Sequence, residues 1–229
     1  MQKPTISLAL AIVLLALSGM ALAEAPAAKV TPDEAIHCLQ EGNLRFSQGK
    51  SRHPNNDSTR RTDTAIGGQH PRATILSCSD SRVPPEIIFD QGIGDIFAVR
   101  VAGNVCGVDE MGTVEYGVDH LGTPLLVVLG HTQCGAVTAA ATGGELHGSI
   151  KSVVDRIIPA VSQAQTAHPD LHGPDLVPAA TEANVWQSIE ELTKNSPIIR
   201  QSVQSGELKV IGAIYDVKSG QVKWLDKHP

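Results

Sequence analysis

The sequence has few aromatic residues and no excess of positive charge. Only 3% of its 229 residues are Phe, Trp or Tyr, so aliphatic side chains must supply most of the packing. The formal net charge is -6, which argues against a nucleic-acid partner, because a phosphate-binding face needs a concentration of Lys and Arg. The chain also lacks a Cys-x-x-Cys motif, an internal repeat and a low-complexity linker, so one globular domain is the economical interpretation.

Only one apolar run is long, and it lies at the start of the chain. A lysine precedes the run over residues 6–17, and Ala21 and Ala23 then offer small residues at the positions that a signal peptidase reads. The run is shorter than the ~20 residues that span a bilayer, which disfavours a membrane anchor. We therefore predict a signal peptide over residues 1–23, a domain over residues 24–229, and export, most naturally to a bacterial periplasm, with no stable membrane anchor after cleavage.

Four continuous apolar runs predict buried strands, at residues 73–78, 96–101, 125–129 and 208–214. Continuous rather than alternating runs suit strands that are buried on both faces. Helical spacing separates these runs, at residues 110–120, 136–141, 149–167 and 179–194. Strands that alternate with helices imply crossover connections, so we predict a single α/β domain with a mainly parallel central sheet flanked by helices.

The two ends of the domain are predicted to add a helical arm and an edge strand. Thr31 with Glu34 three residues later is a capping-box pattern, and we expect a helix over residues 32–46. The polar residues 47–70 are expected to form a long excursion over the surface. A Ser-Gly turn near the C-terminus predicts that residues 217–225 end in an edge strand.

Residues capable of chemistry directly follow two of the predicted strands. The first motif reads Cys-Ser-Asp-Ser-Arg, and an extended backbone would project Cys78, Asp80 and Arg82 to one side. The second reads Gly-His-Thr-Gln-Cys-Gly, and it places His131 and Cys134 on one face of a tight turn or first helical turn. In open parallel sheets, ligands bind beyond the carboxyl ends of the strands. Both motifs are therefore candidate parts of one site.

A Cys₂His zinc site is the chemistry that these residues favour. Catalytic zinc commonly keeps three protein ligands and one open position, and Cys78, His131 and Cys134 would supply such a set for one ion per chain. Two thiolates and a neutral imidazole leave the site formally neutral, so a bound water can ionise near neutral pH. Taken singly, a Cys after a strand is usually a small buried hydrophobe, and Asp80 with Arg82 could be a surface ion pair. The combination favours zinc.

The two motifs together, about fifty residues apart, resemble those of the β-carbonic anhydrases, and the resemblance covers nearly the whole chain after residue 31. It implies reversible hydration of CO₂ to bicarbonate and a proton, by attack of a zinc-bound hydroxide. Cys78, His131 and Cys134 would bind zinc. Asp80, paired with Arg82, would accept a hydrogen bond from the hydroxide. In the family's inactive closed form Asp80 would be a fourth metal ligand, and the sequence leaves open which form is the resting one.

The resemblance also implies a substrate pocket typical of the plant-like branch of the family. Gln69 would donate a hydrogen bond to the substrate, and the amide of Gly135 would orient an oxygen of the product. Phe97 and Tyr116 would form the apolar wall of the pocket. The implied ligands are CO₂ and bicarbonate.

Two positions concern regulation and assembly. Arg100 matches a basic residue that forms a non-catalytic bicarbonate site with a Trp in the allosteric branch, but Ile75 stands where that Trp would be, which argues against bicarbonate inhibition through that site. The family builds dimers by exchanging N-terminal helices. An uncovered amphipathic arm over residues 32–46 would expose apolar surface, so we predict a homodimer or a larger homo-oligomer.

Three other functions use some of the same residues. A CS₂ or COS hydrolase would share the zinc set and differ in tunnel shape and oligomer packing. A non-catalytic zinc-binding or storage protein predicts a closed four-ligand site and has no need for Arg82 or Gln69. A redox protein that used Cys78 and Cys134 would leave the paired His and Asp unexplained. The remaining cysteines, Cys38 and Cys106, either pair with each other or stay as buried thiols.

Overall fold

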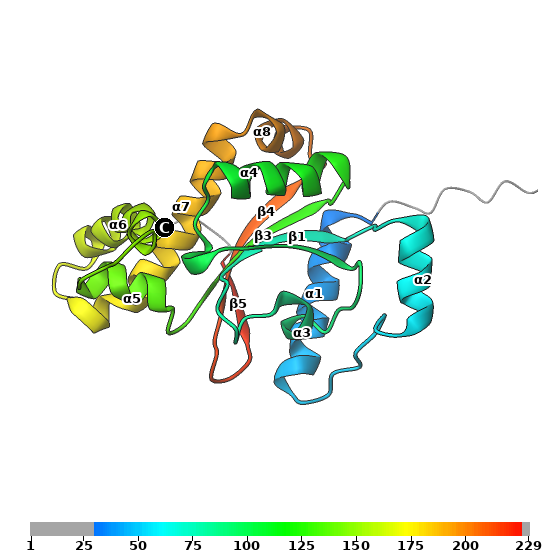
Figure 1. Cartoon of the computed structure of the whole chain (residues 1–229), viewed down its shortest axis with the longest axis horizontal. Helices are drawn as coiled ribbons and strands as arrows, with labels where there is room; N and C mark the ends of the chain where they lie inside the picture. The colour runs from blue at the N-terminus through cyan, green and yellow to red at the C-terminus, as the bar shows by residue number, and fades with distance from the viewer. Residues whose placement is uncertain (1–29, 226–229) are drawn as a thin grey trace, which may run out of the picture.

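A five-stranded sheet forms the centre of the structure, a computed structural model that describes residues 30–225 (Figure 1). Its strands, in the spatial order β2-β1-β3-β4-β5, are β1 (Ala73–Ser77), β2 (Ile96–Arg100), β3 (Leu125–His131), β4 (Lys209–Tyr215) and β5 (Val222–Leu225). The first four pair in parallel, and β5 pairs antiparallel with β4. The predicted mainly parallel sheet and its edge strand are confirmed. The predicted signal peptide, residues 1–23, lies outside the described residues.

Helices cover both faces of the sheet. They are α1 (Pro32–Ser47), α2 (Ser58–Gly67), α3 (Pro85–Ile88), α4 (Val108–Glu115), α5 (Gly135–Thr142), α6 (Ile150–Ala167), α7 (Val177–Asn195) and α8 (Pro197–Gln204). Shorter helical turns lie at Ala102–Asn104, Tyr116–His120 and Gly173–Leu176. In Figure 1, α1 and α3 lie on one side of the sheet, α4 and α8 on the other, and α5 and α6 beyond one end. Across residues 30–225, no helix is long and apolar enough to cross a membrane.

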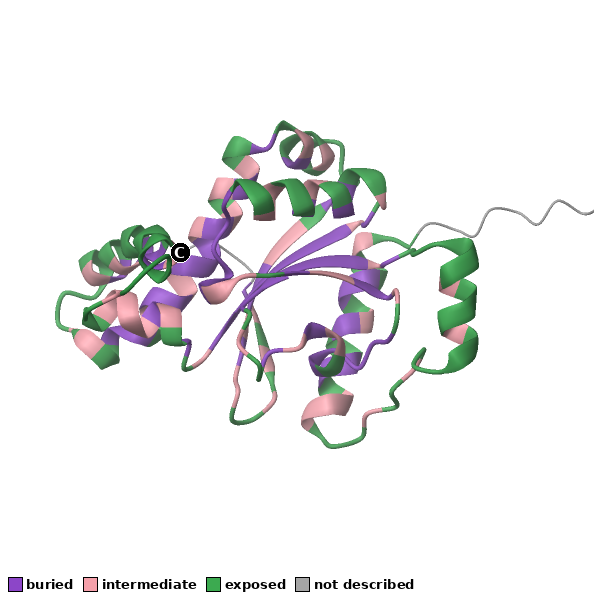
Figure 2. Ribbon diagram, in the orientation of Figure 1, coloured by how far each residue is buried: buried purple, intermediate pink, exposed green. Residues whose placement is uncertain are grey.

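The hydrophobic core occupies both faces of the sheet because side chains alternate along each strand. Ile75 and Val127 pack with α1 and α3 in one cluster, whereas Leu76 and Val128 pack with α4 and α7 in another. All residues of β1 and β3 are buried (Figure 2). Burial on both faces is the reason that these strands read as continuous apolar runs in the sequence.

The N-terminal arm folds onto its own chain. Its capping box is present: the Thr31 hydroxyl accepts from the Glu34 amide at 3.3 Å, and the Glu34 carboxylate accepts from the Thr31 amide at 2.8 Å. Ala35 and Leu39 are fully buried in the cluster that also contains Ile75. The chain therefore covers part of this helix itself, and the predicted homo-oligomer stays a prediction.

Part of the expected surface excursion over residues 47–70 is a helix, α2. Asp57 caps it by accepting from the Arg60 amide at 2.8 Å. None of its residues is buried, so it has no apolar face that the sequence could reveal. Arg60 connects it to the domain by donating to the Ile93 carbonyl at 2.7 Å and to the Asp95 carboxylate at 3.1 Å.

A buried carboxylate, Asp90, fixes the chain between α1 and α2 to the end of α3. It is 1% exposed, and it accepts from Arg45 Nε at 2.6 Å and from the amides of Arg52 and His53 at 3.0 and 2.9 Å. Burial alone would raise the pKa of Asp90, but these hydrogen bonds outweigh burial and lower it. Ionised Asp90 therefore stabilises the folded state.

We expect Asp90→Asn to lower the free energy of unfolding by about 2 kcal/mol at pH 7, because hydrogen bonds to a charged acceptor become weaker ones to a neutral amide. A depressed pKa stabilises the folded state fully above the pKa of the unfolded chain, about 3.9. This stabilisation is lost as the pH falls through the pKa of the folded state. The difference between Asp90→Asn and wild type should therefore shrink below about pH 4. Urea denaturation from pH 7 to pH 3 measures this, with exposed Asp63→Asn as control, and a pH-independent difference would contradict it.

Candidate metal centre

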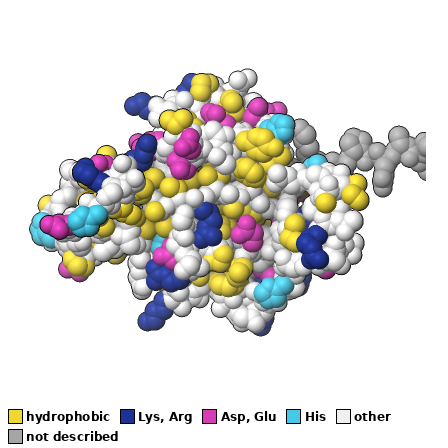
Figure 3. Space-filling model, viewed as in Figure 1, with side chains coloured by type: hydrophobic (Ala, Val, Ile, Leu, Met, Phe, Trp, Pro, Cys, Tyr) yellow, Lys and Arg dark blue, Asp and Glu magenta, His cyan; other side chains and the backbone are white. Residues whose placement is uncertain are grey.

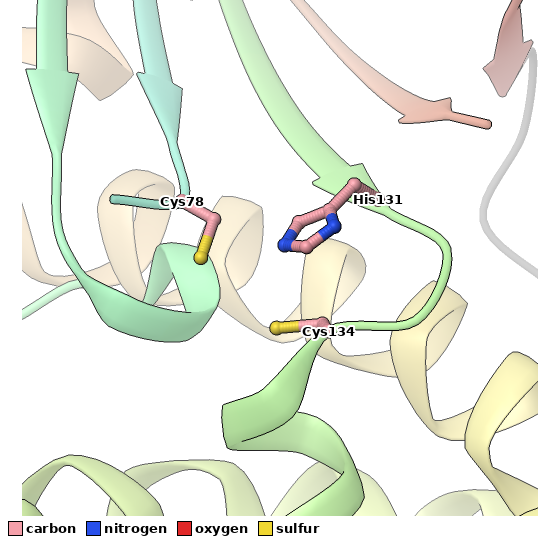
Figure 4. A group of neighbouring side chains, drawn as sticks. All are labelled: Cys78, His131 and Cys134. Atoms are coloured by element: carbon pink, nitrogen blue, oxygen red, sulfur yellow. The ribbon is translucent and has the colours of Figure 1, made fainter. Parts of the chain in front are cut away.

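Parallel pairing brings the two predicted motifs to the same edge of the sheet. β1 and β3 are hydrogen-bonded neighbours, so Cys78 after β1 and His131 at the end of β3 emerge together. Cys134 follows His131 by three residues and caps α5. One potential ligand atom from each of these three residues lies within 4.8 Å of the others, and all three residues are buried (Figure 4). This group could hold a metal ion.

The orientation of His131 fits a metal ligand. Its Nδ1 lies 2.9 Å from the carbonyl oxygen of Thr132, so a proton on Nδ1 can be donated to that carbonyl. In that neutral tautomer Nε2 carries no proton, and it is directed at the two sulfurs. Nε2 is fully buried and has no hydrogen-bond partner among residues 30–225. A buried acceptor without a partner is costly, and a metal ion would satisfy it.

One of the two sulfurs, that of Cys78, favours the thiolate form that binds metals. A hydrogen bond from the Cys134 thiol lowers the pKa of Cys78 to about 4, against the effect of burial and with further help from the amides of Asp80 and Gly103. The same hydrogen bond, together with burial, raises the pKa of Cys134, which keeps its proton. Without metal, one proton is therefore shared by the pair and one thiolate already exists near neutral pH.

Asp80 and Arg82 lie beside this group and form a bidentate pair. Arg82 Nε and Nη2 donate to the two carboxylate oxygens at 3.0 and 2.8 Å, and the Arg82 amide adds a third bond at 2.9 Å. Asp80 Oδ2 is 4.0 Å from His131 Nε2. The hydrogen bond from Arg82 lowers the pKa of Asp80 to about 2, so this carboxylate is ionised. Arg82 also donates to the carbonyl of Gln133 at 3.1 Å and so connects the two motifs.

Two further side chains fix the ligand loops, and the sequence did not assign them this role. Arg100 ends β2 beside Ser77, and it donates to the carbonyls of Cys78 and Asp80 at 3.1 and 2.7 Å. Thr132 donates to Asp216 at 3.2 Å and accepts from the Val217 amide at 3.1 Å, which anchors the second motif to the end of β4. The strand-end position of Arg100, next to the first motif, was the available sequence signal.

The predicted substrate residues divide into two places. Gly135 begins α5 next to Cys134, where it is exposed and an added Cβ would meet nothing within 4 Å. Phe97 instead pairs with Thr74, four residues before Cys78, or about 13 Å along the strand. The ring centroids of Phe97 and Tyr116 lie 5.7 Å apart, with the rings tilted by 39°. Gln69 is exposed and precedes β1 altogether. Within one chain, Gln69, Phe97 and Tyr116 therefore lie apart from the metal centre.

The other two cysteines remain free thiols. Cys38 is half-buried on α1, where Arg72 Nη1 donates to its sulfur at 3.3 Å. Cys106 is buried in the core cluster with Leu76, and burial raises the pKa of its thiol to about 12. The alternative in which Cys38 and Cys106 pair is thus not the one in the structure.

Known proteins match most of this chain. A family model described as carbonic anhydrase matches residues 73–222. Carbonic anhydrase 2 of Mycobacterium tuberculosis is 39% identical over 199 residues, which are 85% of this chain and 93% of that protein. The carbonic anhydrase of Mycolicibacterium smegmatis is 36% identical over 84% of this chain and 92% of its own length. The crystal structure of the β-carbonic anhydrase CafA of Aspergillus fumigatus has a TM-score of 0.69 and 30% identity, over 86% of this chain and 92% of that one.

Metal removal should lower thermal stability and leave the fold intact, because the two core clusters beside β1 and β3 do not depend on the ion. Free zinc a hundredfold above its Kd would add about 2.7 kcal/mol to the free energy of unfolding, and the unfolding temperature should fall by about 5–10 °C on chelation. Circular dichroism with and without chelator measures both effects. Cys78→Ser should abolish the shift and Cys38→Ser should retain it; equal shifts in both variants would exclude this centre.

Proposed function

The chain belongs to the β-carbonic anhydrase family, and on that premise we propose that it hydrates CO₂ reversibly to bicarbonate and a proton, with one zinc ion held by Cys78, His131 and Cys134. The observation that carries the proposal is the convergence of two sulfurs and an unpartnered imidazole nitrogen in one buried group. Two sulfurs and one nitrogen suit zinc and leave a tetrahedral position open. When bound, zinc lowers the pKa of a water molecule to about 7 and so supplies hydroxide near neutral pH.

Asp80 is proposed to orient the attacking oxygen. An ionised carboxylate can only accept hydrogen bonds, and this one lies 4.0 Å from the nitrogen that faces the metal position. By accepting the hydrogen of the nucleophile, Asp80 would direct a lone pair of the oxygen toward the carbon of CO₂. The Asp80 carboxylate needs little reorganisation during the reaction, because Arg82 already binds both of its oxygens.

Arg82 is proposed to keep the resting site open. Its bidentate hydrogen bonds to Asp80 oppose movement of that carboxylate onto the metal. Its hydrogen bond to the Gln133 carbonyl fixes the guanidinium in place. The role of Asp80 as a fourth metal ligand stays a prediction for a closed form in which this pair is broken. Gly135, at the N-terminal end of α5, is proposed to offer its amide to an oxygen of the product.

The substrate pocket is proposed to be completed by a second copy of the chain. Phe97 lies beside Thr74 with Tyr116 packed on it, and Gln69 precedes β1, so these residues are proposed not to reach a molecule bound at their own metal centre. Their surroundings suit an interface, since Tyr116 is 45% exposed and Val108, at the start of the neighbouring α4, is 85% exposed. Hydrophobic side chains gather across the middle of the face shown in Figure 3. This arrangement supports the proposal of a homodimer or larger homo-oligomer.

We expect fast CO₂ hydration by the zinc-loaded protein and a loss of about 100-fold in kcat/KM in Asp80→Ala, because the nucleophile loses its orienting acceptor. Stopped-flow hydration at pH 8, with zinc quantified in each sample, measures this. Asp63→Ala, which removes an exposed carboxylate from α2, is the matched control and should leave the rate unchanged. Full zinc occupancy without hydration would overturn the proposal and turn attention to CS₂ or COS hydrolysis or a non-catalytic zinc role.

Subunit complementation tests the shared pocket. Cys78→Ser should abolish activity and Gln69→Ala should reduce it, each as a pure oligomer. Refolding the two variants together gives hybrids in which one site combines an intact metal centre with an intact Gln69 from the partner, so activity should rise above both parents. No rise, in mixtures that light scattering shows to be oligomeric, would place Gln69 in the site of its own chain. A wild-type monomer at micromolar concentration would contradict the oligomer itself.

A further inference from the structure

The sulfur of Cys78 rests against a short backbone turn, Ala102–Asn104, that follows β2. The amide of Gly103 donates to Cys78 Sγ at 3.2 Å. Gly103 has φ of 70°, and a Cβ there would approach Ile157 Cδ1 to 2.7 Å, so the position needs glycine for both its conformation and its packing. The Gly103 amide is therefore closely packed. Any residue that fixes the direction of this amide also affects its hydrogen bond to the Cys78 sulfur.

Two side chains of α7 hold this turn from behind. Asn184 Nδ2 donates to the carbonyl of Gly103 at 2.7 Å, and Ser188 Oγ donates to the carbonyl of Asn104 at 2.9 Å. Asn184 and Ser188 are one helical turn apart, so they reach two consecutive carbonyls from one face of α7. Both are buried, at 0% and 1% exposure. Helix α7 can come this close because Gly130 in β3 has no Cβ, which would lie 2.7 Å from Val185.

Stability alone does not explain Asn184. Its Oδ1 is buried and has no hydrogen-bond partner within the described part of the chain, and Asn104 Nδ2 nearby is in the same condition. A buried polar atom without a partner is unfavourable, and a leucine of similar size would avoid this cost on the inner face of α7. The Asn184 amide donates its bond to Gly103, the residue whose own amide contacts a metal-binding sulfur.

We propose that Asn184, assisted by Ser188, is a positioning residue for the metal centre, which holds Gly103 so that its amide stays bonded to the sulfur of Cys78. An N–H···S bond withdraws electron density from the sulfur, and this tunes both how tightly it holds the metal and how strongly the metal attracts electrons from its other ligands. The inference rests on the proposed metal centre but not on CO₂ hydration. Asn184 touches neither metal nor substrate and acts through Gly103.

The test compares Asn184→Leu with Thr181→Val, a matched control one turn earlier on α7. Thr181 is also buried, but its hydroxyl bonds to the Val177 carbonyl of its own helix. Asn184→Leu should weaken zinc binding about tenfold in a chelator competition, as loss of outer-shell bonds generally does. In the cobalt-substituted protein it should also shift the sulfur-to-cobalt charge-transfer band. Thr181→Val should do neither. Ser188→Ala offers a second, milder variant, which should shift both readouts in the same direction, if Asn184→Leu folds poorly.

A purely structural role predicts a different pattern. If Asn184→Leu and Ser188→Ala lower the stability of the metal-free protein while zinc affinity and the cobalt spectrum match those of Thr181→Val, the proposal is wrong. The outcome is separate from that of the proposed activity. A wild-type protein that binds zinc without hydrating CO₂ would remove the activity, yet the affinity and spectral shifts of Asn184→Leu would still support the positioning role.

Discussion

The hydrogen-bonded pairing of β1 with β3 is the constraint on which the metal centre depends. In their parallel register, Ser77 lies opposite Leu129. Cys78, the first residue beyond β1, and His131, the last residue of β3, therefore lie at the same end of the sheet. Both strands are buried on both faces between two apolar clusters. A slip of one residue would exchange the side chains of the two faces and would also separate the sulfur from the imidazole, so core packing and metal geometry enforce the same register.

Charge at the site is organised by one guanidinium. Arg82 bonds both oxygens of Asp80 and the carbonyl of Gln133, and thereby joins segments that are far apart in the sequence. Gln133 has φ of 58°, a conformation that costs a non-glycine residue energy, and the bond from Arg82 helps to hold it. Both carboxylate oxygens of Asp80 are therefore held in place before any ligand arrives, which is the condition for effective electrostatic stabilisation.

Much of this could be predicted from sequence, for identifiable reasons. The strands were visible because burial on both faces leaves unbroken aliphatic runs. Cys78, Asp80, Arg82 and His131 were visible because each belongs to a polar motif at the end of a strand. Helix α2 was not, since it buries nothing. The role of Asn184 was out of reach as well, because it acts on a turn eighty-one residues earlier in the chain, and no local pattern reports such a contact. Whether Gln69 meets its own metal or a partner's depends on assembly, which a single chain's pattern does not encode.

Because the two sulfurs of the centre lie close together, metal binding competes with disulfide formation. If the chain is exported as predicted, Cys78 and Cys134 reach an oxidising compartment with their ligand atoms within 4.8 Å of each other and one of them already a thiolate. Such neighbours are a small movement away from a disulfide, which would use up both metal-binding sulfurs. A bound metal ion would then also protect the two sulfurs from oxidation. The yield of working enzyme would be decided by whether metal capture outpaces oxidation during maturation.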